Sequence, residues 1–112
     1  MTKVITVTKG DKRYELTFTR EVVVAMERSG FDIDSVLKMP VTRIPQLFRG
    51  SLVAKHPKMM TDEADELWET LKNKEKLVAA LIAIYRDVVN ALFSAPEDED
   101  DEKNATWETN WK

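Results

Sequence analysis

The first eighteen residues alternate between apolar and polar side chains, a period of two that is typical of β-strands. Two strands, residues 3–8 and 13–18, are predicted on either side of Gly10 and Asp11. A Gly-Asp pair favours a two-residue hairpin loop, because glycine takes the positive φ that a type II′ turn requires. The register set by this loop places five apolar side chains on one face: Ile5, Val7, Tyr14, Leu16 and Phe18. A lone hairpin is marginal in water, so we expect this face to pack on helices.

After the second strand, apolar residues recur every three or four positions, which predicts amphipathic helices. The predicted helical segments are 20–28, a short turn that ends at Lys38, 43–55, 62–72 and 74–94. Thr19, Thr42, Thr61 and Asn73 precede four of these segments, where a hydroxyl or amide side chain accepts hydrogen bonds from the first free amides. Pro45 then falls in the first turn of its helix, where a missing amide costs little.

These elements predict an α+β fold that is mainly α, with an N-terminal β-hairpin packed on a bundle of four to five helices. A chain of 112 residues has room for one such domain, which we place in residues 1–95. Residues 96–112 form a tail with seven acidic residues and two lysines, a charge of −5. The remaining 13 acidic and 15 basic residues give the rest of the chain +2. A tail as acidic as this cannot bury enough apolar surface to offset the conformational entropy that it would lose on folding. We therefore predict that the tail is disordered.

Composition limits the environments and partners of the chain. There is no cysteine, which excludes disulfides, zinc–thiolate sites and thiol chemistry. The N-terminus lacks the apolar run of a signal peptide. The longest apolar stretch, from Leu77 to Phe93, is interrupted by Arg86 and Asp87, so no membrane span is expected. Lysine and arginine do not cluster along the sequence, which argues against nucleic acid as a partner. We therefore expect a cytoplasmic protein that binds neither membranes nor nucleic acid.

Side chains suited to catalysis or metal binding are few. His56 is the single histidine, and the chain has no cysteine or second histidine with which it would form a triad or a metal site. Four carboxylates share one predicted helix: Asp62, Glu63, Asp65 and Glu66. Their spacing fits a solvated first turn rather than a pocket for acid–base chemistry. The three glycines are too far apart for a phosphate-binding loop. We expect no catalytic residue, no cofactor and no metal, and so a binding protein rather than an enzyme.

Two groups of apolar residues are candidates for binding a partner. The first group comprises Leu47, Phe48, Leu52, Leu67 and Trp68 with one row of the last helix, Val78, Ile82, Tyr85, Val89 and Phe93. Either all of these residues form the core or some of them face a partner. The second group, Trp107 and Trp111, lies in the acidic tail. An exposed indole offers ~150–250 Å² of contact area, so these two either fold back onto the body or dock on a partner.

Several blocks of sequence occur in an order and spacing that resemble a known family. The blocks are Tyr14–Arg20, Met26–Phe31, Ile44–Phe48, Ala54–Pro57 and Asn104–Glu108. Together they resemble the small tail assembly chaperones of long-tailed phages and prophages of Gram-positive bacteria, over nearly the whole chain. The resemblance implies a non-structural assembly factor of the host cytoplasm. Such a factor binds the tape measure protein, keeps it soluble and helps tail tube subunits assemble around it.

For such a chaperone we expect apolar surface that receives amphipathic helices, an acidic tail that keeps the complex soluble, and self-association. From exposure arguments, and not from the family, the candidate contact residues are Leu47, Phe48, Leu52, Trp68, Trp107 and Trp111. Two alternatives stay open. One is a small prophage adaptor or regulatory protein whose acidic tail mimics nucleic acid. The other is the subunit of an enzyme whose active site lies elsewhere.

Overall fold

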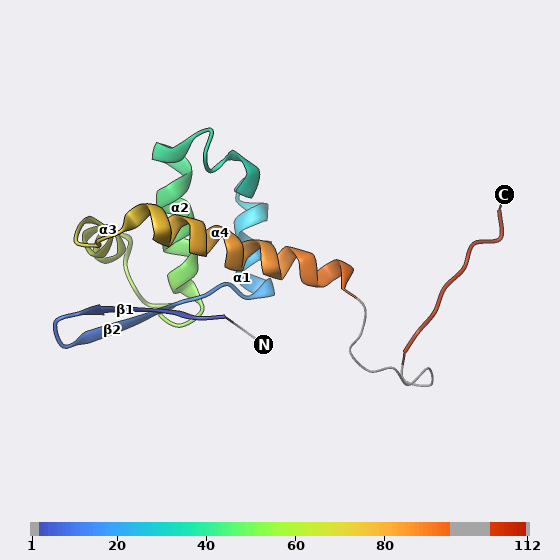
Figure 1. The fold of residues 1–112 in the computed structure, drawn as a ribbon, viewed down its shortest axis with the longest axis horizontal. Helices are drawn as coiled ribbons and strands as arrows, with labels where there is room; N and C mark the ends of the chain where they lie inside the picture. Colours follow the sequence, from blue (N-terminus) through green and yellow to red (C-terminus); the bar gives the residue numbers. More distant parts are fainter. Residues whose placement is uncertain (1–2, 95–103, 112) are drawn as a thin grey trace.

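The computed structural model of the chain describes residues 3–94 and 104–111. Within these segments a two-stranded hairpin is followed by four α-helices and two short 3₁₀ turns (Figure 1). The elements are β1 (Ile5–Lys9), β2 (Lys12–Leu16), α1 (Arg20–Arg28), η1 (Ile33–Ser35), α2 (Pro40–Val53), α3 (Thr61–Glu69), α4 (Lys74–Asn90) and η2 (Ala91–Phe93). The predicted fold class, an N-terminal hairpin with a helical bundle, is confirmed.

The hairpin has the predicted register. Its strands are antiparallel, with Val7 opposite Tyr14. Gly10 has a φ of 59°, whereas Asp11 is not among the residues with positive φ, a combination that fits a type II′ loop. The second strand ends at Leu16, two residues earlier than predicted.

The outer edge of β2 is tied to α2 and to the loop that follows it. The amide of Thr17 donates a hydrogen bond to the carbonyl of Ser51 at 2.9 Å. The amide of Glu15 donates to Nε2 of His56 at 3.0 Å. The imidazole ring of His56 also lies 5.7 Å from the ring of Tyr14, measured between centroids. These contacts join the hairpin to the helical part of the chain through amides that would otherwise need water.

α1 begins and ends with recognisable signals in the sequence. The hydroxyl of Thr19 accepts a hydrogen bond of 3.2 Å from an amide of the first turn, as predicted. Gly30, with a φ of 97°, directs the chain out of the helix. The amides of Gly30 and Phe31 donate to the carbonyls of Glu27 and Met26, both at 3.0 Å. This pair of hydrogen bonds is a Schellman motif, which favours glycine at the left-handed position.

α2 begins three residues before the predicted start. Thr42 was the predicted N-cap, but the helix starts at Pro40, and Met39 at the N-cap makes no side-chain hydrogen bond. Proline fits the first helical position because its φ is already helical and an amide there would lack a partner. Pro45 therefore lies in the second turn rather than the first. There it removes the hydrogen bond that the carbonyl of Val41 would otherwise accept.

The ends of α3 and α4 also differ from the prediction. Thr61 is the first residue of α3 rather than its N-cap, and the helix ends at Glu69 instead of near Lys72. Asn73 occupies the N-cap of α4 as predicted, but its side chain makes no capping hydrogen bond. Its backbone is left-handed, with a φ of 56°, which asparagine tolerates better than most residues. Asn73 therefore shapes the short connection between α3 and α4.

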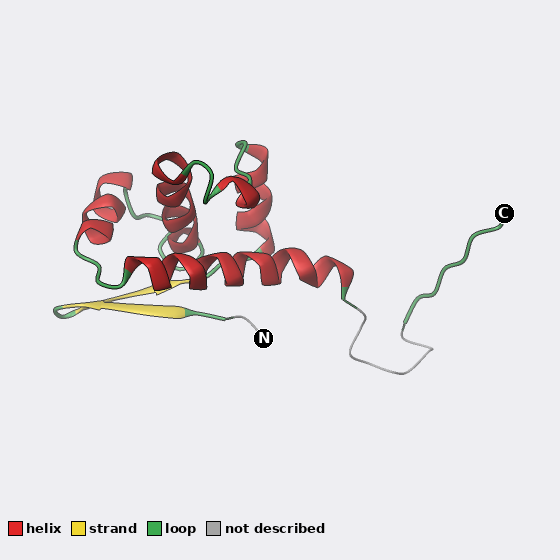
Figure 2. Ribbon diagram, turned by 45° about the horizontal axis from the view of Figure 1, so that its top comes forward, coloured by secondary structure: helices red, strands yellow, loops and turns green. Residues whose placement is uncertain are grey.

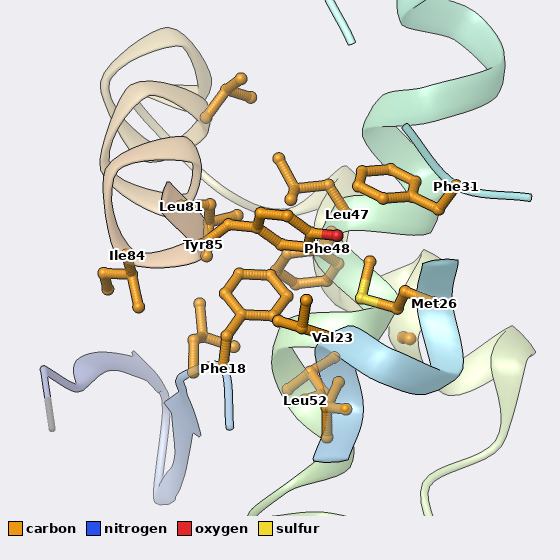
Figure 3. Packing of buried hydrophobic residues seen from close by; sticks show 14 of the residues in the cluster. Phe18, Val23, Met26, Phe31, Leu47, Phe48, Leu52, Leu81, Ile84 and Tyr85 are labelled. Carbon is orange, nitrogen blue, oxygen red and sulfur yellow. The ribbon is translucent and has the colours of Figure 1, made fainter. Parts of the chain in front are cut away.

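The core is built around α2, which contacts α1, α3, α4 and β2. Figure 2 shows α4 crossing the other helices. Tyr85 on α4 extends towards the rings of Phe18 and Phe31, with centroid distances of 5.2 and 5.5 Å (Figure 3). Phe18 follows β2 and Phe31 follows α1, so the burial of these rings against Tyr85 holds the ends of the hairpin and of α1 to α4.

The described part of the tail, residues 104–111, forms no helix or strand. The acidic run at 97–102, for which we predicted disorder, lies outside the described residues. Across the segments that are described, no helix combines the length and apolar character needed to cross a membrane.

Candidate partner-binding groove

Three of the six predicted contact residues belong to the core. Leu47, Phe48 and Leu52 are only 0%, 1% and 2% exposed, so their side chains are not accessible to a partner. For these three residues the exposure that we expected is not found, and the alternative applies in which they are core. The physical reason is the central position of α2, which packs against other elements on several sides.

A surface groove lies where α2, α3 and α4 meet the loop that precedes α2. Its volume is about 410 Å³. The lining residues are Leu37, Ile44, Trp68, Lys74, Glu75, Val78, Ala79 and Ile82. The two charged residues of this set, Lys74 and Glu75, lie in the first turn of α4, and the other six residues are apolar. We call this feature the Trp68 groove.

Trp68 joins the groove to the core. Its ring centroid lies 5.0 Å from that of the buried Phe48, at an interplanar angle of 55°. Nζ of Lys74 lies 6.0 Å from the Trp68 ring centroid, within the range of a cation–π contact. The same ammonium group donates a hydrogen bond to the carbonyl of Leu71 at 3.0 Å. Trp68, one of the predicted contact residues, is therefore held in place from both sides and lines the groove.

Packing and a paired charge fix the helix that carries Trp68. Ala64 and Leu67 of α3 are buried in the core. Nε and one terminal nitrogen of Arg49 on α2 donate to the two carboxylate oxygens of Asp65 at 3.0 and 2.8 Å. A bidentate pair of this kind sets the rotation of α3 against α2. Because both side chains are partly exposed, it contributes only about 0.5–1 kcal/mol to stability.

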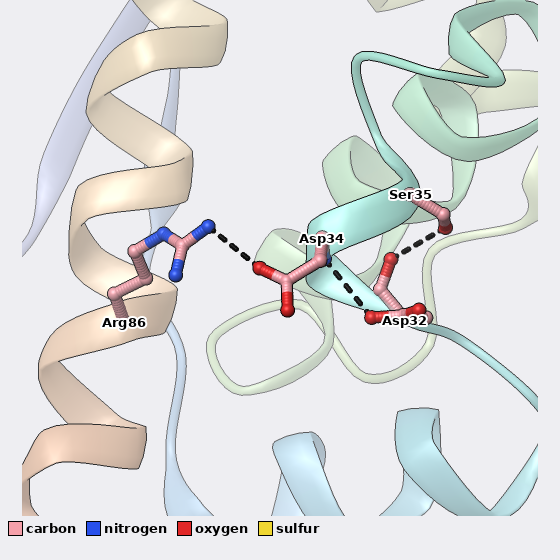
Figure 4. A network of polar contacts seen from close by, with 4 residues as sticks. All are labelled: Asp32, Asp34, Ser35 and Arg86. Atoms are coloured by element: carbon pink, nitrogen blue, oxygen red, sulfur yellow. Dashed lines mark hydrogen bonds and ion pairs between the residues drawn. The ribbon is translucent and has the colours of Figure 1, made fainter.

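The loop that carries Leu37 is held against α4 by polar contacts (Figure 4). The carboxylate of Asp32 accepts a hydrogen bond from the amide of Asp34 at 3.0 Å. The backbone carbonyl of Asp32 accepts a second one, of 2.6 Å, from the hydroxyl of Ser35. The guanidinium of Arg86 on α4 donates to the Asp34 carboxylate at 2.9 Å. This network places Leu37, which is 76% exposed, at the edge of the groove.

The two tail tryptophans are accessible. Trp107 is 86% exposed and Trp111 is 75% exposed, so neither indole is buried against the body in the structure. The six predicted contact residues are thus divided among three places. Three lie in the core, Trp68 lines the groove, and two are exposed on the tail.

A second surface gathers positive charge that is dispersed in the sequence. Lys12 and Arg13 of the hairpin and Lys55 and Lys58 after α2 line an open depression of about 650 Å³. Glu63 is the acidic residue in this lining. The cations come from two distant segments, so the sequence pattern does not reveal the cluster. Four cations are few for phosphate-backbone binding, and the expectation that nucleic acid is not a partner stays a prediction.

Some groove residues have a signal in the sequence and others do not. Val78 and Ile82 belong to the second apolar row of the last helix, which already suggested a partner surface. Leu37 lies in an irregular segment where no periodicity distinguishes an exposed from a buried position. Among the side chains of residues 3–94 and 104–111, no three His, Cys, Asp or Glu are grouped so that they would hold a metal ion.

Comparison with known proteins gives a family without a described activity. A protein-family model described as a domain of unknown function (DUF5055) matches residues 1–111. No curated protein and no solved structure matches the chain. The family match extends through the tail as far as Trp111, so it includes the groove and both exposed tryptophans.

Proposed function

The chain belongs to the DUF5055 family, and we propose that it is a phage tail assembly chaperone that binds the tape measure protein and aids tail tube assembly. The description of the family names no function, so support for this proposal comes from the chain itself. The sequence blocks that resemble the small tail assembly chaperones provide the first support. They include Ile44–Phe48, which contributes Ile44 to the groove.

The Trp68 groove is the observation that carries the proposal. It is apolar and lies at the surface, and three helices and a loop form its walls. Grooves of this kind receive the apolar face of an amphipathic helix, whose anchor side chains recur at three- and four-residue spacing. The resemblance implies a long, helical partner that aggregates alone, and covering its apolar face would keep such a partner soluble.

The proposed activity takes place in the host cytoplasm, with the tail tube protein as a second partner and with self-association. A further apolar surface supports more than one contact. Leu92 and Phe93 at the end of α4 are 59% and 85% exposed. Large apolar side chains that are adjacent and exposed often mark a protein interface.

Co-expression with the neighbouring tape measure protein tests this function. We expect the intact chain to raise the soluble fraction of the tape measure protein several-fold. Ala79→Arg, which places a long cation in the groove at an exposed helical position, should remove this effect. Ala83→Arg is the matched control, because Ala83 is exposed on the same helix but does not line the groove.

Two results would count against the proposal. If the intact chain leaves the solubility of the tape measure protein unchanged, the chaperone function fails. If Ala79→Arg works as well as Ala83→Arg, the Trp68 groove is not the binding site. Gene order gives an independent check, because a chaperone gene should lie between the tail tube gene and a very long tape measure gene. A position in a regulatory cluster would favour the adaptor alternative.

A further inference from the structure

The tail presents two bulky apolar side chains in a defined geometric relation. Trp107 and Trp111 are four residues apart, and residues at that spacing share one face in both a helix and an extended strand. Each indole offers ~150–250 Å² of apolar area. Both are exposed in the structure, so they are accessible for binding. Whatever conformation the segment adopts, it can direct two anchors at one surface.

The Trp68 groove matches this segment in polarity. Its walls are apolar apart from Lys74 and Glu75, and its volume of about 410 Å³ leaves room for bulky side chains. The charge of −5 on residues 96–112 faces a body of +2, so the tail is attracted to the body at low salt.

The length of the chain allows the tail to reach its own groove. Eleven residues of helical rise separate Ile82 from Phe93, a distance of ~17 Å. Thirteen residues lead from Ser94 to Trp107, and a chain of that length spans at most ~43 Å, which exceeds this distance. A site that a linker can reach receives the end of that linker at an effective concentration of up to ~mM. A dissociation constant equal to this concentration fills the groove half of the time, and one about ten-fold lower fills it in nine of ten molecules.

We propose that residues 104–111 bind the Trp68 groove of their own chain through Trp107 and Trp111, in competition with the partner. The inference rests on the proposed function, because it assigns the partner to the same groove. It also indicates the chemistry of the partner segment, which would fill the groove with large apolar side chains in place of the two tryptophans. The tail thereby protects an apolar surface until a matching segment arrives.

A spin label on the tail tests the contact directly. The chain has no cysteine, so Thr106→Cys gives a single labelling position, and Thr106 lies off the face shared by the two tryptophans. We expect a nitroxide there to broaden the amide signals of Leu37, Ala79 and Ile82 in the full chain. The same label in a chain with Trp107→Ser and Trp111→Ser is the control, and it should leave those signals sharp.

Dilution separates binding within one chain from binding between two copies. Mixing the labelled chain with an excess of unlabelled, isotopically silent chain should leave the broadening unchanged, because the contact is within one molecule. Loss of the broadening on dilution would overturn the inference, since the tail would then bind a second copy. Absence of broadening at the groove in every sample would also overturn it.

Competition with a peptide separates this inference from the proposed function. The probe is an amphipathic helical peptide with two leucines four residues apart. If the tail occupies the groove in nine of ten molecules, the chain with Trp107→Ser and Trp111→Ser binds the peptide ~10-fold more tightly than the native chain. Equal affinities would overturn the inference and leave the groove as a partner site. Broadening by the label without any peptide binding would instead support the tail contact and contradict the proposed function.

Discussion

Tyr85 carries a phenol into the aromatic part of the core. Its side chain is 1% exposed, and its ring lies against Phe18 and Phe31. Burial raises the pKa of Tyr85 from 10.0 to about 12, and the charges of Glu27 and Asp32 act in the same direction. The folded chain therefore favours the neutral phenol over the tyrosinate, because the anion would lose its hydration and face two acidic groups.

This raised pKa predicts a loss of stability between pH 10 and pH 12. In the unfolded chain Tyr85 ionises near 10.0, whereas in the folded chain it keeps its proton up to about 12. The unfolded state binds fewer protons in this range, so the free energy of unfolding falls as the pH rises. The loss is about 1 kcal/mol at pH 11 and about 2 kcal/mol at pH 12.

Tyr85→Phe keeps the ring contacts and should remove this part of the pH dependence. The measurement is urea unfolding of both chains at pH 8 and pH 11, and the difference between the chains isolates the contribution of the Tyr85 phenol. An equal loss of stability in the two chains would show that the phenol of Tyr85 does not carry the effect.

At the scale of elements, the hairpin depends on its attachment to α2 and to the loop that follows it. The amide of Glu15 has His56 as its acceptor, and Thr17 has the carbonyl of Ser51. Replacing His56 by alanine removes one of these two acceptors and the ring contact with Tyr14. We expect His56→Ala to lower the free energy of unfolding by about 0.5–1.5 kcal/mol.

The control is His56→Gln, whose side-chain oxygen reaches nearly the position of Nε2 and retains an acceptor. Urea midpoints give the global effect, and hydrogen exchange of the Glu15 amide gives the local one. We expect fast exchange of that amide in His56→Ala and slow exchange in His56→Gln. Slow exchange in both variants would mean that the hydrogen bond from Glu15 to His56 does not hold the strand edge.

Elements whose signals are local were predicted well from the sequence. The Gly10-Asp11 loop sets the hairpin register by itself, and the Thr19 hydroxyl caps α1 within one turn. The start of α2 was predicted incorrectly, because Pro40 and Thr42 are both good helix starts and the hydrophobic pattern does not choose between them. The conformation of the loop before α2 determines which of these two residues begins the helix.

At the scale of the whole molecule, α2 is the element against which most of the other elements pack. It contacts α1, α3, α4 and β2, so its hydrogen bonds cannot open without disrupting the core. We expect the amides of residues 47–52 to exchange only through global unfolding. Amides of η2 should exchange at least ten-fold faster by fraying, because its side chains are exposed. Native-state hydrogen exchange measures both, and similar rates in the two segments would contradict a core centred on α2.

The central position of α2 also explains which part of the site was predictable. Apolar spacing correctly marks Leu47, Phe48 and Leu52 as one helix face but does not show that other elements cover that face. Trp68 and Leu37 come from segments far apart in sequence, and their meeting at one groove depends on the packing of α3 and on the Arg86–Asp34 contact. The sequence left open whether the tail tryptophans fold back onto the body or dock on a partner, and the structure shows both of them exposed.

The proline in the second turn of α2 has a mechanical consequence for the groove. Pro45 leaves the Val41 carbonyl without its helical partner, so the first turn of α2 is held by fewer hydrogen bonds than the rest. Ile44 directly follows that weakened turn and forms one side of the groove, whereas Trp68 and α4 form a wall fixed to the core. We expect a groove with one rigid wall and one less constrained side to adapt its width to different side chains. Such a groove would suit a partner that is long, repetitive in shape and variable in sequence.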